Sequence, residues 1–167
     1  MSNIQELKEK VLKAQQTSDI ASLYVLESDA HEFFSEDDLQ GFYANILDLA
    51  LEKLTTTLEA HRQMDINEVQ DFATLRALYE YAIEHYHAGK MQDASALFEV
   101  LSGLSQDEKF SKAMKVHQIA TDKALDIDNF LEKIADIEST QQMGTFYISE
   151  FQKEAQNLLN NTQSVGE

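Results

Sequence analysis

The chain has 167 residues with thirteen Lys and Arg against thirty Asp and Glu, a formal net charge of −17. The electrostatic field of a strongly negative protein repels phosphate backbones and attracts cationic partners, so we expect no nucleic-acid ligand. The chain has no cysteine, no basic and apolar leader and no apolar run long enough to span a membrane. These features predict a cytoplasmic protein without disulfides, thiolate chemistry or membrane insertion.

The first third of the chain has the period of amphipathic helices. A capping box at Ser2 predicts a helix over residues 2–16, and a second helix is expected after Ser18, with a pattern that blurs over residues 28–31. Ser35, followed by three acidic residues, predicts the start of the longest helix. The hydroxyl can accept from unpaired amides there, and carboxylates favour the positive end of the helix dipole.

The rest of the chain continues in shorter helices. One is expected from residue 66 or 67 to Gly89, where glycine tolerates the left-handed conformation that ends a helix. Another is expected over residues 91–101, closed by Gly103. Three more are indicated around residues 110–120, 130–137 and 148–159.

These elements predict an all-α fold, a helical bundle of about seven to eight helices that contains one helical hairpin. The length fits a single domain, expected over residues 1–159, with a flexible C-terminal tail at residues 160–167. Zero proline agrees with uninterrupted helices. Residues 144–148 alone have strand propensity, and a lone strand has no partner to pair with.

The nearest approach to a metal motif is Glu84 with His87, three residues apart on a predicted helix. Carboxylate-bridged di-iron bundles need that motif twice, and the sequence contains no second Glu-x-x-His. A stretch opening at Asp126 begins like a calcium loop, but Leu131 stands where the loop needs glycine. Asp128 is expected to cap a helix instead. We therefore expect no metal and no other cofactor.

No motif for nucleophilic catalysis is present. The chain lacks a Gly-x-Ser-x-Gly elbow and a glycine-rich phosphate loop, and five glycines leave few places to build one. We expect a protein that is not an enzyme, with an enzyme of unrecognised type as a less favoured alternative.

Residues 75–104 have the spacing of a helical hairpin. Small residues in both helices let them approach, a glycine makes the turn, and an aromatic side chain fills the interface. The stretch resembles one tetratricopeptide repeat, and any hairpin with small contact residues would give the same pattern, so both interpretations stay open. The residues that carry the resemblance are Leu78, Ala82, Gly89, Ala94 and Phe98.

The Gly-Lys turn at residues 89–90, followed by Ala94 and Phe98, is similar to the first repeat of the tetratricopeptide-like chaperones of type III secretion. Size, acidity and helical character also resemble flagellar export chaperones and their co-chaperones. Either resemblance implies a cytoplasmic chaperone, co-chaperone or adaptor that holds an apolar segment of a secreted or flagellar subunit, or of a second chaperone. The alternative is a structural subunit of a helical homo-oligomer.

A turn at Gly89 places one group of side chains on the face that such repeats leave open. An aromatic groove with an acidic rim captures amphipathic segments, so this face is the predicted partner site. The same stripe at helical spacing is equally typical of a buried core, and the sequence leaves that choice open. The residues of this predicted face are Arg76, Tyr79, Ile83, Tyr86 and His87.

Overall fold

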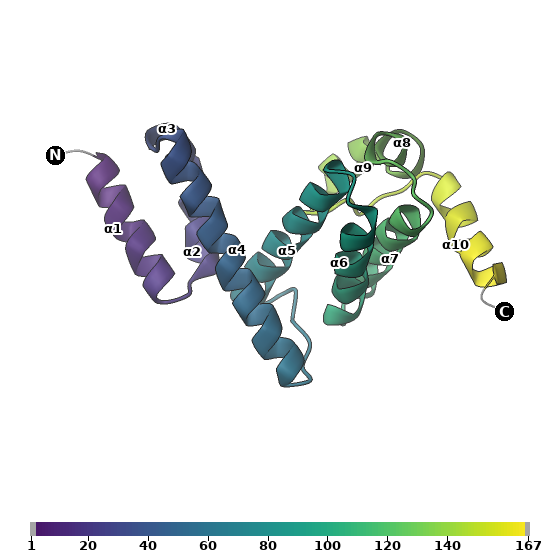
Figure 1. Ribbon diagram of the computed structural model, residues 1–167, viewed down its shortest axis with the longest axis horizontal. Coiled ribbons are helices and arrows are strands. Elements are labelled where there is room, and N and C mark those ends of the chain that lie inside the picture. Colours follow the sequence, from purple (N-terminus) through teal and green to yellow (C-terminus); the bar gives the residue numbers. More distant parts are fainter. Residues whose placement is uncertain (1–2, 166–167) are drawn as a thin grey trace. The chain divides into compact units, whose positions relative to one another are not determined.

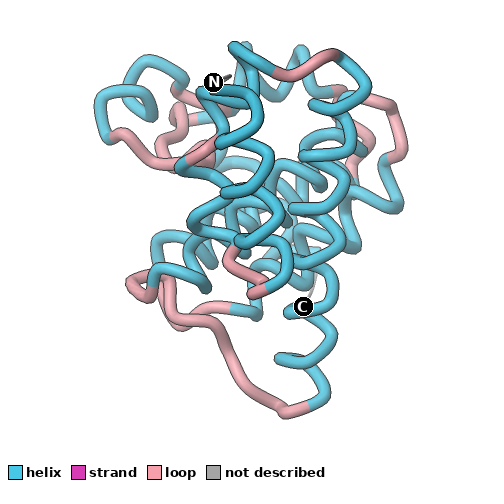
Figure 2. The backbone as a smooth tube through the Cα atoms, turned by 90° about the vertical axis from the view of Figure 1, so that its left-hand side faces the viewer, coloured by secondary structure: helices cyan, strands magenta, loops and turns pink. Residues whose placement is uncertain are grey.

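The structure, a computed structural model, describes the backbone of residues 3–165 and the side chains of residues 3–160. The all-α prediction is confirmed: the described residues form ten α-helices and one π-helical segment. Figure 2 shows helices joined by loops, with no strand among the described residues. The number of helices is higher than predicted because the short helices Glu27–Phe33, Ile127–Asn129 and Ile137–Met143 were not expected as separate elements. None of the helices in the described part of the chain is long and apolar enough to cross a membrane.

The chain divides into two compact units, residues 1–78 and residues 79–167. The single domain expected over residues 1–159 stays a prediction, because a compact unit is not by itself an independently folding domain. One helix, α5, continues from the first unit into the second.

The first unit contains α1 (Asn3–Gln16), α2 (Ile20–Val25), α3 (Glu27–Phe33), α4 (Glu36–Glu59) and the start of α5 (Val69–His87) (Figure 1). The longest helix is α4, as predicted, and its first turn is capped by the Ser35 hydroxyl, which accepts from the Asp38 amide at 3.1 Å. The core consists of apolar side chains from all of these helices. It includes Leu7, Val11, Ile20, Leu23, Ala30, Phe42, Ile46, Ala50 and Leu75.

One helix start in the first unit agrees with the prediction and one helix was not predicted. The second helix starts after Ser18, as predicted, and is capped by Asp19, whose carboxylate accepts from the Ser22 amide at 3.0 Å. The blurred pattern at residues 28–31 belongs to α3, a helix that the periodicity did not predict. The capping box predicted at Ser2 lies outside the described residues.

The second unit contains the end of α5, α6 (Met91–Leu104), α7 (Glu108–Asp122), α8 (Ile127–Asn129), η1 (Phe130–Ile134), α9 (Ile137–Met143) and α10 (Glu154–Val165) (Figure 1). Helices α6 and α7 pack side by side, and α10 packs on α7. Gly89, with φ of 76°, lies in the turn between α5 and α6, and Gly144, with φ of 70°, ends α9. Both glycines have a conformation that a Cβ atom would strain.

Several predicted boundaries in the second unit are wrong. Gly103 lies inside α6 and does not close it, since the helix continues to Leu104. Asp126, and not Asp128, caps the helix after α7, with its carboxylate accepting from the Asn129 amide at 2.8 Å. Helix α10 continues through Val165, past the predicted start of the tail at residue 160, and residues 166–167 lie outside the described part.

Residues 145–153 form an irregular segment where the sequence predicted strand propensity and then a helix start. The Asp136 amide donates to the Glu150 carbonyl at 2.9 Å, and the Gln152 amide donates to the Ile134 carbonyl at 2.8 Å. These bonds frame one isolated antiparallel bridge between Ala135 and Phe151. Backbone groups of Glu150 and Gln152 thus pair with residues 134–136 and not within a helix, and α10 begins after them, at Glu154.

Candidate functional site

The five residues of the predicted open face have different environments. Tyr79 is 5% exposed and Tyr86 is 1% exposed, so both tyrosines belong to the core of the second unit. Ile83 is half-buried and His87 is exposed. Arg76 belongs to the first unit. The expectation that the two tyrosines line an open groove is therefore wrong.

Aromatic packing explains why Tyr86 is buried. Its ring lies against Phe98 of α6 and Phe130 of η1, with centroids 6.3 and 5.7 Å away. Its hydroxyl donates to the carbonyl of Leu125, which lies in the connection after α7. Burial, followed by the charge of Asp126, raises the pKa of Tyr86 above its usual value. Tyr86 thus links α5 to three other parts of the unit.

Tyr79 belongs to a buried chain of hydrogen bonds. His117 Nδ1 lies 2.7 Å from the Ala113 carbonyl, which can only accept, so this nitrogen carries the proton. The Tyr79 hydroxyl therefore donates to His117 Nε2 at 2.9 Å and accepts from the Ile148 amide at 3.1 Å. Burial lowers the pKa of His117 to about 4, so the ring is neutral at pH 7. Every polar atom of the Tyr79 and His117 side chains therefore has a hydrogen-bond partner.

The hydrogen-bonded Tyr79 and His117 side chains are buried among aromatic rings. His117 is 0% exposed and packs against Phe98, Phe130 and Phe151. A neutral imidazole that is fully paired and walled off from solvent stabilises the fold. The hydrogen-bonded pair of Tyr79 and His117 is therefore part of the core of the second unit.

The predicted hairpin residues also lie in the core. Leu78, Ala82, Ala94 and Phe98 are each at most 1% exposed. The Tyr79 and Tyr86 rings of α5 both lie 6.3 Å from the Phe98 ring of α6. These side chains hold the two helices together across the turn at Gly89.

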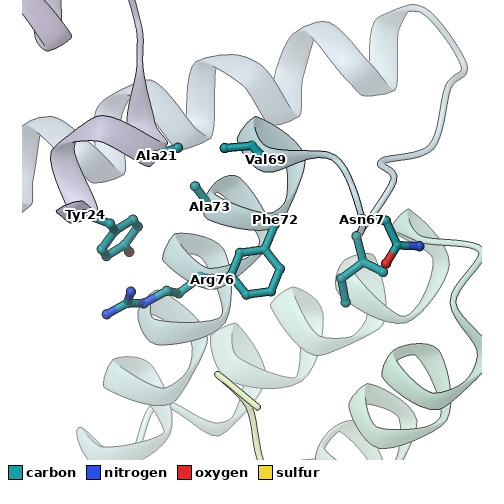
Figure 3. Close-up of a pocket in the computed structure, with 8 residues that line it drawn as sticks. Ala21, Tyr24, Asn67, Val69, Phe72, Ala73 and Arg76 are labelled. Atoms are coloured by element: carbon teal, nitrogen blue, oxygen red, sulfur yellow. The ribbon is translucent and has the colours of Figure 1, made fainter. Parts of the chain in front are cut away.

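An apolar hollow of about 420 Å³ opens on the surface of the first unit and is the candidate functional site. Figure 3 shows Tyr24 and Arg76 at one end of the hollow and Asn67 at the other, with the Phe72 ring between them. Val69 is 66% exposed and Phe72 is 43% exposed, which is unusual for large apolar side chains on a helix. The remaining lining residues are Ala21, Ile66 and Ala73.

Arg76 is held rigidly at the end of this hollow. Its guanidinium lies over the Tyr24 ring, 3.9 Å from the centroid, and forms an ion pair with Glu27 at 3.1 Å. The second carboxylate oxygen of Glu27 accepts from the Tyr43 hydroxyl, which also meets His31 Nε2 at 2.7 Å. Stacking and pairing together restrict the rotamers of a long side chain that would otherwise be mobile.

The segment that borders the hollow is acidic. Asp65 and Glu68 are both exposed and flank Ile66 and Asn67 in the connection before α5. Asp71, one residue before Phe72, is paired with Lys53 at 2.9 Å and accepts from the Asp65 amide at 2.9 Å. The Asp65 carboxylate accepts from the Asn67 amide at 2.9 Å, and the Glu68 carboxylate accepts from the Gln70 and Asp71 amides at 3.1 and 2.9 Å. Exposed apolar side chains of the hollow therefore lie next to two exposed carboxylates in the sequence.

The hollow has the composition of a binding surface. Its polar members are an amide, a phenol and an arginine that is already paired, and no nucleophile with an adjacent base lies among them. Among the described residues, no three His, Cys, Asp or Glu side chains cluster so as to hold a metal ion. Glu84 and His87, the pair considered for metal binding, are both exposed.

Comparisons with protein-family models, with curated proteins and with solved structures found no match to this chain.

Sequence reasoning placed Arg76 at the binding site but missed the other residues of the hollow. Tyr24, Val69 and Phe72 follow the apolar periodicity of the helices expected after Ser18 and up to Gly89, and side chains in such a stripe are normally buried. The signal that could have found them is the dense set of acidic residues from Asp65 to Asp71 around two large apolar side chains. A stripe with carboxylates on both sides is less suited to a core than one flanked by neutral residues.

Proposed function

We propose that this protein is a non-enzymatic binding module that captures an amphipathic segment of a partner protein in the hollow of the first unit. Apolar side chains of that segment occupy the hollow beside Val69 and Phe72, and basic side chains meet Asp65 and Glu68. The role that accords with this binding is that of a chaperone or adaptor for a secreted or flagellar subunit, as the resemblance of residues 75–104 implies.

The exposure of Phe72 and Val69 supports this proposal most directly. Large apolar side chains that gather in a hollow on a monomer are typical of interaction sites. Burial of such an aromatic side chain in a complex provides the kind of anchor that dominates binding energy. The net charge of −17 adds long-range attraction for a basic partner.

The test uses a fluorescein-labelled helical peptide with leucines on one face and lysines on the other. We expect Phe72→Ala to weaken its binding, measured by fluorescence anisotropy, by about tenfold or more, because the anchor contact is removed. Leu58→Ala is the matched control, since Leu58 is 48% exposed in the same unit but does not line the hollow. It should bind the peptide as the wild type does.

A second peptide, with alanines replacing the leucines, measures attraction by net charge alone. Equal binding of the two peptides, or equal losses for Phe72→Ala and Leu58→Ala, would contradict a role for the hollow. The chaperone role is tested separately by purifying tagged wild type and Phe72→Ala from the native host. A secreted or flagellar subunit retained by the wild type and lost by the variant would support it.

A further inference from the structure

The second unit has a groove whose charge is opposite to that of the whole molecule. It lies between α7 and α10 and the segment before α10, and has a volume of about 370 Å³. Three lysines line it, Lys109 and Lys112 from α7 and Lys153 just before α10, while Glu150 is the one acidic residue among the described lining residues. For a chain with thirteen basic and thirty acidic residues, this is a local reversal of charge.

Two of the three lysines are available to a ligand. Lys109 is paired with Glu150 at 3.1 Å, and hydrogen bonds from Ser149 and Lys109 hold the pKa of Glu150 below its usual value. Lys112 and Lys153 are exposed and form no ion pair with any residue of the described part of the chain. No described residue of the unit therefore neutralises their positive charges through an ion pair.

The groove has an apolar floor, and hydrogen bonds hold the segment before α10 that forms one of its sides. Ala113, Val116 and Ala155 are buried in the floor, with Phe151 and Leu159 half-buried beside them. The segment before α10 is anchored by the Gln152 side chain, which donates to the carbonyls of Glu132 and Ala135 at 2.7 and 2.8 Å. Apolar side chains can therefore enter a preformed groove while acidic side chains meet its rim.

From this combination we infer that the groove between α7 and α10 binds an acidic amphipathic segment of a partner protein. Its carboxylates pair with Lys112 and Lys153, and its apolar side chains pack on Val116, Phe151 and Leu159. Charge complementarity decides the occupant: a basic segment would meet like charges at the rim, and a neutral one would leave the two lysines without counter-charges. This site is in the other unit from the hollow and selects the opposite charge.

The probe is a fluorescein-labelled helical peptide with leucines on one face and glutamates on the other. The net charge of −17 repels it, so binding has to come from a local site. We expect the double variant Lys112→Glu, Lys153→Glu to weaken binding by about tenfold or more, measured by fluorescence anisotropy at low salt. The double variant Lys112→Gln, Lys153→Gln, which removes charge without reversing it, should cause a smaller loss in the same direction.

Lys115→Glu is the matched control, because Lys115 is exposed on α7 but does not line the groove. It should lower the affinity much less than the groove variants do, because Lys115 does not line the groove. Phe72→Ala should leave the binding of the acidic peptide unchanged. The proposal for the groove can therefore be wrong while the proposal for the hollow is right, and the reverse. Peptides with alanine for leucine, or glutamine for glutamate, should both bind more weakly.

Three outcomes would overturn the inference. One is the absence of binding by the acidic peptide, and another is an equal loss of affinity for Lys115→Glu and the groove variants. The third is a wild-type homodimer in sedimentation velocity that becomes monomeric in the double Glu variant, which would make a second copy the occupant.

Discussion

Tyr79 and His117 form a buried hydrogen-bonded pair that shows how one side chain can be polar and still belong to a core. The tyrosine hydroxyl is bonded to both His117 Nε2 and the Ile148 amide, so its removal leaves a buried acceptor and a buried donor without partners. Such orphaned groups cost more than the net value of the bonds themselves. Removal of the Tyr79 hydroxyl is therefore expected to lower the stability of the second unit.

Tyr79→Phe is expected to lower the free energy of unfolding by about 1–3 kcal/mol, because the ring is retained and only the hydroxyl is lost. Tyr81→Phe is the matched control on the same helix, since Tyr81 is half-buried, and its hydroxyl should contribute less than about 0.5 kcal/mol. Urea unfolding followed by circular dichroism measures both. Equal stabilities of the two variants would show that the bond to His117 contributes nothing.

His117 makes stability depend on pH between about 4 and 6.5. Its pKa in the folded protein is lowered to about 4 from 6.5. Between these two pH values the imidazole is protonated in the unfolded chain but neutral in the folded protein. Stability from this group is thus fully present above the unfolded pKa and is lost as pH falls toward the folded one. Between pH 7 and pH 5 the expected loss is roughly 2 kcal/mol.

Urea unfolding at about pH 7 and about pH 5 measures this loss, and His117→Gln supplies the comparison. Glutamine can still donate and accept hydrogen bonds but does not titrate, so the variant should be less stable at pH 7 and should depend less on pH. A variant with the same pH dependence as the wild type would assign the effect to other groups.

At the scale of the helices, two glycines in the same hairpin have opposite roles. Gly89 has a left-handed φ of 76° in the turn between α5 and α6, while Gly103 is helical near the end of α6. A Cβ atom added at either position would meet no atom within 4 Å. Any difference between alanine substitutions at the two positions therefore comes from the backbone.

Gly89→Ala is expected to destabilise the protein by about 1 kcal/mol, because alanine strains the left-handed conformation. Gly103→Ala is expected to stabilise it by about 0.5–1 kcal/mol, because alanine favours the helix and restricts the unfolded chain. Thermal unfolding of both variants beside the wild type checks the two signs. The same sign for both would contradict the assigned turn at Gly89.

At the scale of the whole molecule, acidic charge dominates. The thirty acidic side chains have only thirteen basic ones to oppose them, so the folded chain repels itself. Local exceptions such as the Lys112 and Lys153 rim therefore stand out against the average. The binding of a charged segment depends on the site it meets as well as on the net charge.

The melting temperature is expected to rise between about 10 mM and about 150 mM sodium chloride, since the Debye length falls from about 30 Å to about 8 Å and screens this repulsion. Potassium chloride at the same ionic strength should give the same rise, which separates screening from specific ion binding. A melting temperature that is unchanged or lower at the higher ionic strength would show that self-repulsion does not limit stability.

The sequence alone determined the all-α class, the long helix opened by Ser35 and the turn at Gly89. These features depend on local chemistry: helical periodicity, a hydroxyl cap and the left-handed conformation of glycine. The tertiary structure decided which apolar stripe is buried, because that depends on what packs against each face. Phe98 and His117 enclose Tyr79, whereas Phe72, on the same helix, keeps 43% of its surface exposed in the hollow.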